Sequence, residues 1–432
     1  MDMSKVFRSS LGIKYPSLRD HPLHSAEKWL EGKNIDDGAE GYWRIHDHLY
    51  DLSGFIESHP GGKDWIQLTK GTDITEAFES HHLSTNAEML LPSFLLRKAS
   101  SPRSFPFTFH ENGFYKTLKR RIIKQMENLP ENPADRSKSL IDRIFSGYLT
   151  SFLLAVYFES FAIGAVSGIF LGLLTVAAHN FFHQKDNFRR FYFDFSMMSS
   201  REWRVSHVLS HHMYTNTICD MEISSVEPFL QYLPGEKNLL VRYGSWVYSF
   251  GFYAFLFLGH YLKTLAVNFL KGNSQFIWTA LLPFTIPFLS WMITGKSILI
   301  CLLMYIWIIV IASIHFGIVG LNAAHHHPDI FHDGDAARPK EQMDWGLFQV
   351  DTVADRRDIT GSHFLVLTNF GDHALHHLFP TVDHGHLEQF YPIFLETCVE
   401  FGVRWKFLTQ LDLVKGQYGQ LARILPNKNP PN

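Results

Sequence analysis

Eight histidines gather in three short groups, each at the end of a long apolar stretch. Residues three or four positions apart on an α-helix share one face, so each group could direct its imidazoles at a single point. Imidazole binds iron, copper, nickel and zinc, whereas magnesium or calcium would need carboxylates, which these groups lack. One such pair alone would more often be ordinary surface or core histidines, but three groups favour a metal centre. Eight ligands exceed the four that a tetrahedral zinc ion uses, which predicts two metal ions. The groups are His179 and His183; His207, His211 and His212; and His373, His376 and His377.

The composition is that of a membrane protein with a soluble part. The chain has 432 residues, more than one domain usually contains, and 15% of them are aromatic. The formal net charge is only -3 and no dense basic tract is present, which argues against nucleic acid as a partner. Cys219, Cys301 and Cys398 lie far apart and predict neither a disulfide framework nor a thiolate metal site. The first residues lack the apolar core of a signal peptide, so we expect the N-terminal domain to stay in the cytosol.

The composition divides the chain into three parts. Residues 22–98 alternate short apolar runs with turns and charged helices, as in a small soluble α+β domain, and YWRIHDHLYDL predicts two strands around a turn at Ile45–His48. Residues 99–140 are rich in Ser, Pro and charge, which predicts a linker with a helix at Lys116–Met126. Residues 141–425 contain the long apolar stretches and all three histidine groups, which predicts an all-α membrane domain.

The apolar stretches predict four transmembrane helices. Phe145–Phe182 is too long for one span of about 20 residues, so we expect two spans with a break near Gly164. Phe276–Ile293 and Ser297–Leu321 predict a second pair. Tyr243–Leu270 is interrupted by polar residues and is expected to lie along the membrane interface. An even number of crossings would place the N-terminal domain and all three histidine groups on the same, cytosolic face.

A second pattern surrounds His59 in FIESHPGGKDW, which is followed by GTDITEAFESHH. The small residues Pro60–Gly62 let the backbone approach a flat cofactor closely. Over residues 40–90 the sequence resembles the haem-binding core of cytochrome b5. The resemblance implies haem b, with His59 as one axial ligand and His82 as the other, and the adjacent His81 is the alternative. A haem with two histidine ligands does not readily bind oxygen, so it passes single electrons instead.

The histidine groups read HNFFH, HVLSHH and HALHHLFP, and over residues 145–392 they resemble the histidine boxes of membrane fatty acyl desaturases. The resemblance implies that the eight histidines bind two iron ions and form the catalytic centre, with O2 and a lipid acyl chain as substrates. The fusion to a cytochrome b5 module is similar to that of front-end and sphingolipid desaturases. His373 stands where front-end enzymes commonly carry glutamine, and the first box lacks their aspartate, so the resemblance does not extend to the position of the new bond.

The desaturase resemblance also implies a ninth metal ligand near the end of the last apolar stretch. There GLNAAHHHP offers His325, His326 and His327. If the helix continues, Asn322 and His326 lie four residues apart on one face. We predict His326 as the ligand, with His325 as the alternative, and Asn322 acting through a bound water. His315, earlier in the same stretch, is expected to find only a hydrogen bond.

Together these features predict a cytochrome b5-like α+β domain followed by an all-α desaturase-like membrane domain with four transmembrane helices. We expect a haem-linked di-iron oxygenase, embedded in membrane lipid, that desaturates fatty acyl or sphingolipid chains. Its electrons would come from NADH-cytochrome b5 reductase, because the chain has no GxGxxG turn of its own. The expected location is the endoplasmic reticulum membrane, with the haem domain and the histidines facing the cytosol. The alternative predictions are a lipid hydroxylase of the same architecture and a non-catalytic electron-transfer protein.

Overall fold

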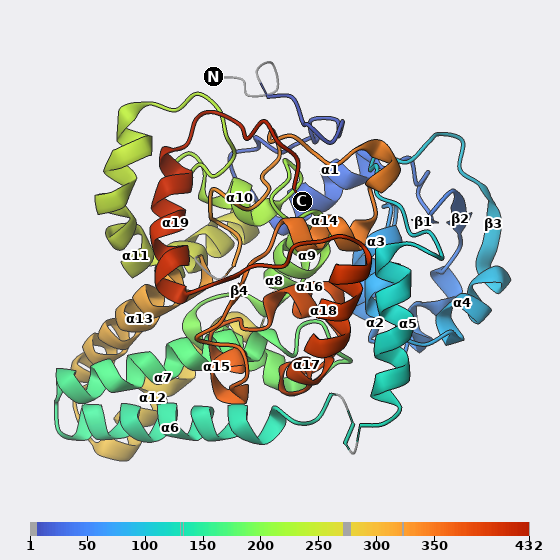
Figure 1. Cartoon of the computed structure of the whole chain (residues 1–432). Coiled ribbons are helices and arrows are strands. Elements are labelled where there is room, and N and C mark those ends of the chain that lie inside the picture. Colours follow the sequence, from blue (N-terminus) through green and yellow to red (C-terminus); the bar gives the residue numbers. More distant parts are fainter. Residues whose placement is uncertain (1–6, 130, 133, 271–277, 322–323, 432) are drawn as a thin grey trace.

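The computed structural model describes residues 7–129, 131–132, 134–270, 278–321 and 324–431. Figure 1 shows a small N-terminal domain with three strands on one side of the molecule and a group of long helices on the opposite side. Short helices that carry the second and third histidine groups lie between these two parts. This arrangement confirms the predicted order of an α+β domain followed by a mainly helical domain.

The N-terminal domain is built on a small antiparallel sheet. Its strands β1 (Trp43–Ile45), β2 (His48–Tyr50) and β3 (Leu95–Lys98) are ordered β1-β2-β3, and Ile45 pairs with His48, so the turn falls where the sequence predicts it. The surrounding elements are α1 (Ala26–Asp36), η2 (Ser53–Ser58), α2 (Lys63–Leu68), α3 (Thr75–His81), α4 (Asn86–Leu90) and η3 (Leu91–Phe94). The core beneath the sheet contains Trp43, Ile45, Tyr50, Leu52, Ile66 and Phe78.

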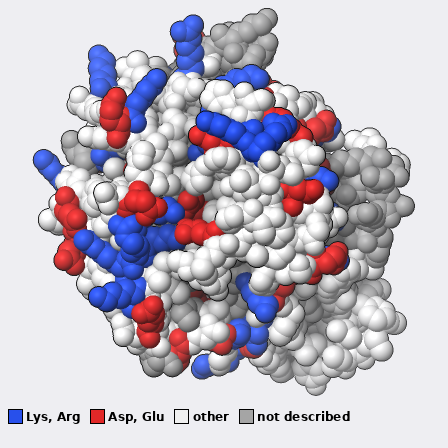
Figure 2. All heavy atoms as spheres, turned by 90° about the vertical axis from the view of Figure 1, so that its right-hand side faces the viewer, with Lys and Arg blue, Asp and Glu red and all other residues white. Residues whose placement is uncertain are grey.

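The charged side chains of the N-terminal domain are mixed in sign. Figure 2 shows basic and acidic residues interspersed on the face that this domain presents, without a broad field of one sign. Within the domain, Lys63 pairs with Glu57 and Arg97 pairs with Glu40. Exposed pairs of this kind contribute little to stability, so the domain depends on its core and on its contacts with the rest of the chain.

Much of the predicted linker is packed rather than free. Helix α5 (Phe114–Met126) includes the predicted helix and begins two residues before it. Its residues Tyr115, Leu118 and Ile122 are fully buried in the largest apolar core, which also contains residues of the C-terminal part. The segment between the two domains therefore helps to hold them together.

The long helices form two hairpins. Helices α6 (Lys138–Tyr157) and α7 (Phe161–His179) make the first, and α12 (Leu282–Thr294) and α13 (Ile298–Gly320) make the second. The break in the first hairpin lies at residues 158–160, where the side chain of Ser160 caps α7, so Gly164 lies within a helix and not at the predicted break. Ser160 accepts a hydrogen bond from a free backbone N–H of the first turn, which favours a helix start at this position.

The number of apolar helices agrees with the prediction, but one member differs. Four described helical segments are long and apolar enough to cross a membrane, namely Lys138–Tyr157, Phe161–His179, Leu240–Leu270 and Ile298–Gly320. The segment Trp278–Thr294, formed by the 3-10 turn η7 (Trp278–Leu281) and α12, is apolar but shorter. By length and composition, the fourth candidate span is therefore Leu240–Leu270, which we expected at the interface, and not the shorter Trp278–Thr294.

The contacts of α11 (Ser245–Leu270) bear on whether this helix crosses the membrane or lies along its interface. Near its start, Arg242 donates to the carbonyl oxygen of Ala422 at 3.0 Å. Near its end, Thr264 donates to Glu202 at 2.9 Å. Both ends therefore contact segments of the histidine-bearing part, whereas a 2.7 Å ion pair between Lys296 and Glu159 joins the turns of the two hairpins. These contacts agree with an interfacial position for α11.

The short elements that surround the histidines complete the fold. In the order of the chain they are η4 (Phe188–Ser196), α8 (Ser200–Trp203), the π-helix η5 (Arg204–His211), α9 (His212–Tyr214), α10 (Met221–Val226), the π-helix η6 (Leu240–Gly244), η8 (Lys340–Gln342), α14 (Trp345–Asp351), β4 (Asp355–Arg356), α15 (His363–Thr368), α16 (His373–Leu378), α17 (His384–Leu387), η9 (Glu388–Phe390), α18 (Tyr391–Glu400), β5 (Phe407–Leu408) and α19 (Gln410–Ala422). Strands β4 and β5 pair in parallel.

Helices α7 and α13 pack closely because α7 presents three glycines on one face. Gly164, Gly168 and Gly172 are spaced four residues apart, and each lies against α13. A Cβ atom on Gly168 would lie 2.6 Å from Cβ of Ile311 and 2.9 Å from the carbonyl oxygen of Ile308. Small residues at this spacing allow helix backbones to approach in a membrane. The glycine face therefore fixes the helix that ends at His179.

We predict that Gly168→Leu destabilises the protein by about 1–3 kcal/mol, because the new side chain would collide with the backbone of α13. The measurement is thermal unfolding of the full chain in detergent. Gly251→Leu is the matched control, because a Cβ atom there would meet no heavy atom within 4 Å. Equal midpoints for the two variants would contradict the close α7 and α13 contact.

Candidate metal centre

Nine buried histidines converge in two neighbouring clusters at the end of the long helices. The ligand atoms within each cluster lie within 4.8 Å of one another. The first cluster contains His179, His183, His207, His212 and His376, and the second contains His211, His325, His373 and His377. The structure thus brings together all eight histidines of the three predicted groups and adds His325.

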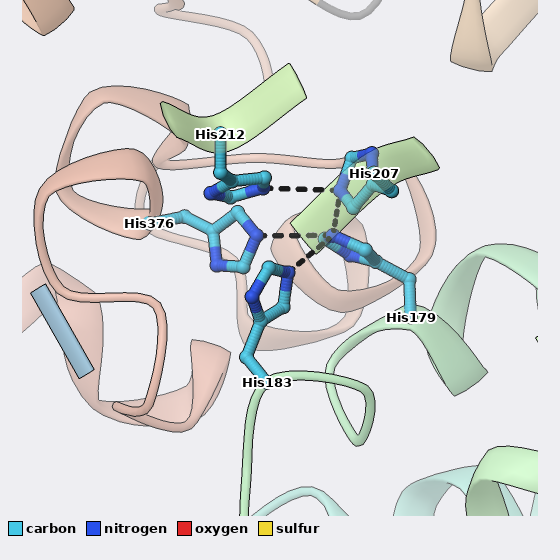
Figure 3. Close-up of side chains that lie close together, drawn as sticks. All are labelled: His179, His183, His207, His212 and His376. Carbon is cyan, nitrogen blue, oxygen red and sulfur yellow. Dashed lines mark hydrogen bonds between the residues drawn. The ribbon is translucent and has the colours of Figure 1, made fainter. Parts of the chain in front are cut away.

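The rings of the first cluster point at a common centre (Figure 3). The Nε2 atom of His179 lies 2.7 Å from that of His207, 3.0 Å from that of His376 and 3.4 Å from that of His183. The Nε2 atom of His212 lies 3.0 Å from that of His207. Two nitrogens that bind one metal at about 2.1 Å lie roughly 3 Å apart, so the spacing fits a metal ion.

The second cluster has the same character. The Nε2 atom of His325 lies 3.0 Å from that of His211 and 2.8 Å from that of His373. The ring of His377 lies 4.7 Å from the ring of His325, centre to centre, and its buried Nε2 atom has no hydrogen-bond partner among the described residues. Four imidazoles therefore surround one small buried volume.

Two of the three histidine groups divide between the clusters instead of pointing at single places. His207 and His211 lie on the π-helix η5, where the backbone N–H of His212 donates to the carbonyl oxygen of His207, five residues earlier. This wider turn places His207 and His212 in one cluster and His211 in the other. Similarly, His376 belongs to the first cluster, while its neighbours on α16 belong to the second.

Acceptor groups orient the rings by binding their other nitrogen. Nδ1 of His207 lies 2.7 Å from Glu222, and Nδ1 of His211 lies 2.9 Å from Asp220. In the second cluster, Nδ1 of His325 lies 3.0 Å from the carbonyl oxygen of Thr352. A carboxylate or carbonyl oxygen accepts a hydrogen bond from Nδ1–H, so in the neutral rings the Nε2 atoms carry the lone pairs that metal-binding histidines require.

The facing nitrogens of His211 and His325 need a positive charge between them. Both rings bind acceptors through Nδ1, so two Nε2 lone pairs would otherwise face each other at 3.0 Å in a buried site. Either a proton or a metal cation removes this repulsion. The donor set, which is entirely imidazole, suits iron and other transition metals.

Burial determines which protonation states the clusters adopt. It lowers the pKa values of His183, His212 and His376 well below the ordinary value, and neighbouring imidazoles lower them further, so these rings are neutral near pH 7. His211 differs, because the carboxylates of Asp220 and Glu222 outweigh its burial and raise its pKa to about 9. Without a metal, His211 therefore holds the proton that it shares with His325, and metal binding releases it.

The cluster geometry favours His325, the alternative, over His326 as the ninth ligand. His326 lies outside both clusters, and its ring stacks on Tyr232 with the ring centres 3.5 Å apart. Helix α13 ends at Gly320, so the spacing of four residues used to choose His326 does not apply. Asn322 lies outside the described residues. Among the described residues, none bonds Nε2 of His315, so the expected hydrogen bond is not found at that atom.

The predicted haem ligands face each other in the N-terminal domain. The rings of His59 and His82 have centres 6.3 Å apart. Nδ1 of His59 lies 2.9 Å from the carbonyl oxygen of Gly62, and Nδ1 of His82 lies 2.9 Å from that of Phe78, so both Nε2 atoms are free to bind. With metal–nitrogen bonds of about 2 Å, two axial rings lie roughly 6 Å apart. The pair fits haem, whereas the ring of His81 points toward His183.

Sequence reasoning missed the residues that orient the metal ligands. Asp220 and Glu222 follow the second histidine group closely in the chain, and this short spacing could have predicted that they bind the Nδ1 atoms of these histidines. Gln349, whose side chain lies 2.9 Å from Nδ1 of His377, is distant in sequence and gave no signal. His384, whose ring lies 4.4 Å from that of His376, carried only the weak signal of a histidine close after the third group.

A cavity of about 390 Å³ adjoins the clusters. It extends between α11, α10 and the end of α13, and its wall is largely apolar. The aromatic and aliphatic lining includes Phe252, Phe255, Leu256, Phe316 and Phe370. Four of the clustered histidines, His207, His211, His325 and His373, also line it. An apolar ligand in this cavity would reach the metal-binding rings directly.

Comparison with known proteins agrees with this geometry. The model of the family "Fatty acid desaturase" matches residues 155–409, and that of the family "Cytochrome b5-like Heme/Steroid binding domain" matches residues 27–100. The chain is 43% identical to the cytochrome b5-related protein of Drosophila melanogaster over 98% of both chains. It is 25% identical to the probable Delta(5) fatty acid desaturase C of Dictyostelium discoideum, over 87% of this chain and 90% of the relative. It is 22% identical to the acyl-lipid (8-3)-desaturase of Mortierella alpina, over 87% of this chain and 91% of the relative. No solved structure matches the chain.

Adjacent histidines provide a sharp test of the second cluster. We predict that His325→Ala loses about one non-haem metal ion per chain, because it removes the ring between His211 and His373. His326→Ala should retain the full metal content, since His326 lies outside both clusters. Metal analysis of the two purified variants distinguishes them, and the reverse pattern would restore His326 as the ligand.

The two centres should also be separable. His59→Ala is expected to abolish the haem absorption spectrum while leaving the non-haem metal in place, because the haem pair and the clusters share no residue. His376→Ala should reduce non-haem metal and retain haem. Haem and metal per chain are measured together. Loss of both centres in either variant would show that they do not form independently.

Proposed function

This chain belongs to the fatty acid desaturase family and carries a cytochrome b5 domain, and we propose that it introduces double bonds into fatty acyl or sphingolipid chains. The family makes it an oxidoreductase of the desaturase type, acting on a lipid acyl substrate with O2. The cytochrome b5 domain binds haem and transfers electrons. The two histidine clusters fit a di-iron centre. The observation that carries the proposal is the convergence of nine buried imidazoles beside an apolar cavity.

We assign one iron ion to each cluster. His179, His183, His207, His212 and His376 would hold the first, and His211, His325, His373 and His377 would hold the second. His59 and His82 would hold the haem. Bound iron supplies the activation of O2 that an unactivated C–H bond requires, since such a bond has no acidity for a general base to exploit. The side chains of the protein orient the ligands, exclude water and position the acyl chain.

The side chains around the clusters position the ligands and exclude water. Glu222 and Asp220 fix the rings of His207 and His211, and Gln349 fixes that of His377. These contacts keep each Nε2 lone pair aimed at the cluster without rearrangement during turnover. The nine rings are buried, so bulk water is excluded from the place where the oxidant forms.

The cavity would position the acyl chain. Its lining of Phe252, Phe255 and Leu256 comes from α11, while Phe316 comes from α13, so the chain would lie between these helices. Its lining includes histidines of both clusters, which supports a position of the bound acyl chain beside the metals. Holding one C–H bond at that point supplies the orientation on which selectivity for one carbon depends.

The electron supply and the location follow from the same architecture. NADH-cytochrome b5 reductase is the proposed donor to the haem. The apolar helices place the protein in a membrane, and we assign it to the endoplasmic reticulum with the haem domain and the clusters on the cytosolic face. The two hairpins agree with this assignment, because each begins and ends on the histidine-bearing side.

Product analysis tests the function. The full chain is expressed with added iron in yeast cells fed deuterium-labelled saturated fatty acids or sphingoid bases, and lipid extracts are analysed by mass spectrometry. We expect a product that has lost two adjacent deuterium atoms and gained a double bond. His376→Ala should reduce this product to background, whereas the control His326→Ala should retain it. A hydroxylated product would identify a hydroxylase, and no product from a chain loaded with haem and iron would identify an electron-transfer protein.

A further inference from the structure

His81 lies between the haem pair and the first metal cluster. It is the last residue of α3 and directly precedes His82, which faces His59 across the haem site. Its ring stacks on the ring of His183, with the ring centres 5.9 Å apart and the planes inclined by 28°. His81 is therefore bonded through the backbone to one proposed iron ligand and touches another.

The contacts of His81 hold its ring in this position. Its Nδ1 atom lies 3.1 Å from the carbonyl oxygen of Ala77 and 3.0 Å from the hydroxyl of Ser80. On the other side the ring contacts Trp65, whose centre is 6.2 Å away. The Nε2 atom is buried and has no hydrogen-bond partner among the described residues, so hydrogen bonding at Nε2 does not explain the placement of the ring.

Polar contacts also join the two domains, through Asp64 and Lys33 of the N-terminal domain. Arg204, next to the second histidine group, lies 3.3 Å from Asp64 of α2 and 2.5 Å from Asp186. The buried ammonium group of Lys33 donates to the hydroxyl of Tyr214 at 2.8 Å. The contact of Lys33 with Tyr214 is buried, whereas Asp64 and Asp186 are partly exposed, so salt weakens the ion pairs of Arg204 more than the Lys33 contact.

We propose that His81 is a positioning residue that couples the haem to the metal cluster around His183 for electron transfer. The inference rests on the proposed function. Each transfer oxidises the haem iron from the ferrous to the ferric state and reduces one ferric ion of the cluster to the ferrous state. No bond is made or broken at His81, and no proton is moved. The stacked ring shortens the gap that the electron must cross between the two sites.

A competing route runs through Tyr115. Its hydroxyl lies 3.0 Å from the carbonyl oxygen of Glu79, in α3, and 3.3 Å from that of Leu378, next to His377. This route also links the haem domain to a metal ligand, but through hydrogen bonds and backbone instead of a ring contact. It therefore provides the matched comparison for His81.

The test measures electron transfer within the full chain, in detergent, without O2 and without lipid. The protein is loaded with haem and non-haem iron, the haem is reduced by a flash-activated flavin, and the decay of the ferrous haem absorption is followed. Electron paramagnetic resonance detects the half-reduced iron cluster, whose signal should grow at the same rate as the ferrous haem absorption decays. We expect His81→Leu to slow this decay on the order of tenfold or more, because the orientation supplied by the ring is lost. His81→Phe keeps a stacked ring and should retain most of the rate, and Tyr115→Phe should leave it unchanged.

Three static measurements accompany the rates. The haem spectrum, the haem reduction potential and the non-haem iron content should be the same in all variants. Loss of haem in His81→Leu would make His81 a haem ligand, and loss of iron would make it part of the metal site, so either result would overturn the coupling role. An unchanged rate in iron-loaded His81→Leu, or a slow rate in Tyr115→Phe alone, would also overturn it. If the unaltered protein binds no iron beyond its haem, the proposed function fails; if it binds the iron and His81→Leu transfers electrons at an unchanged rate, only this inference fails.

Discussion

The buried imidazole nitrogens that face each other impose the constraint on which the centre depends. His211 and His325 present their Nε2 atoms to each other at 3.0 Å while their Nδ1 atoms are held by Asp220 and by the carbonyl oxygen of Thr352. Such a site is stable only when a proton or a metal cation lies between the nitrogens. Because the nine rings come from distant parts of the chain, the metal also contributes to folding.

The surrounding structure distributes charge to suit this constraint. Asp220 and Glu222 lie beside the rings of His211 and His207 and supply negative charge close to the proposed metals. The long helices approach the site from the apolar side, and the glycine face of α7 against α13 fixes the position of His179. The clustered imidazoles are therefore held by carboxylates on one side and by close helix packing on the other.

The sequence predicted which residues form the site better than it predicted how they divide between the clusters and which side chains orient them. The eight histidines follow from local spacing, and the fold class and the pair His59 and His82 follow from the family resemblance, which short and contiguous motifs carry. The choice of His326 assumed that α13 continues, whereas the helix ends at Gly320 and His325 joins the second cluster. The division of the second group depends on the π-helix η5, and regular α-helical spacing cannot reveal such a turn. Long-range partners such as Gln349 require the tertiary structure.

The docking of the haem domain changes what the fusion accomplishes. A tethered domain raises the effective concentration of an electron donor, but it must still find its acceptor at each transfer. Here α3 is held against the histidine-bearing part by buried contacts such as that of Glu76 with Tyr214. The two haem ligands consequently face different surroundings: His59 is followed by the partly exposed turn at residues 60–63, and His82 adjoins the residue that stacks on His183. If His81 couples the two sites as inferred, electrons would leave the haem through α3 without the domain having to search for its acceptor.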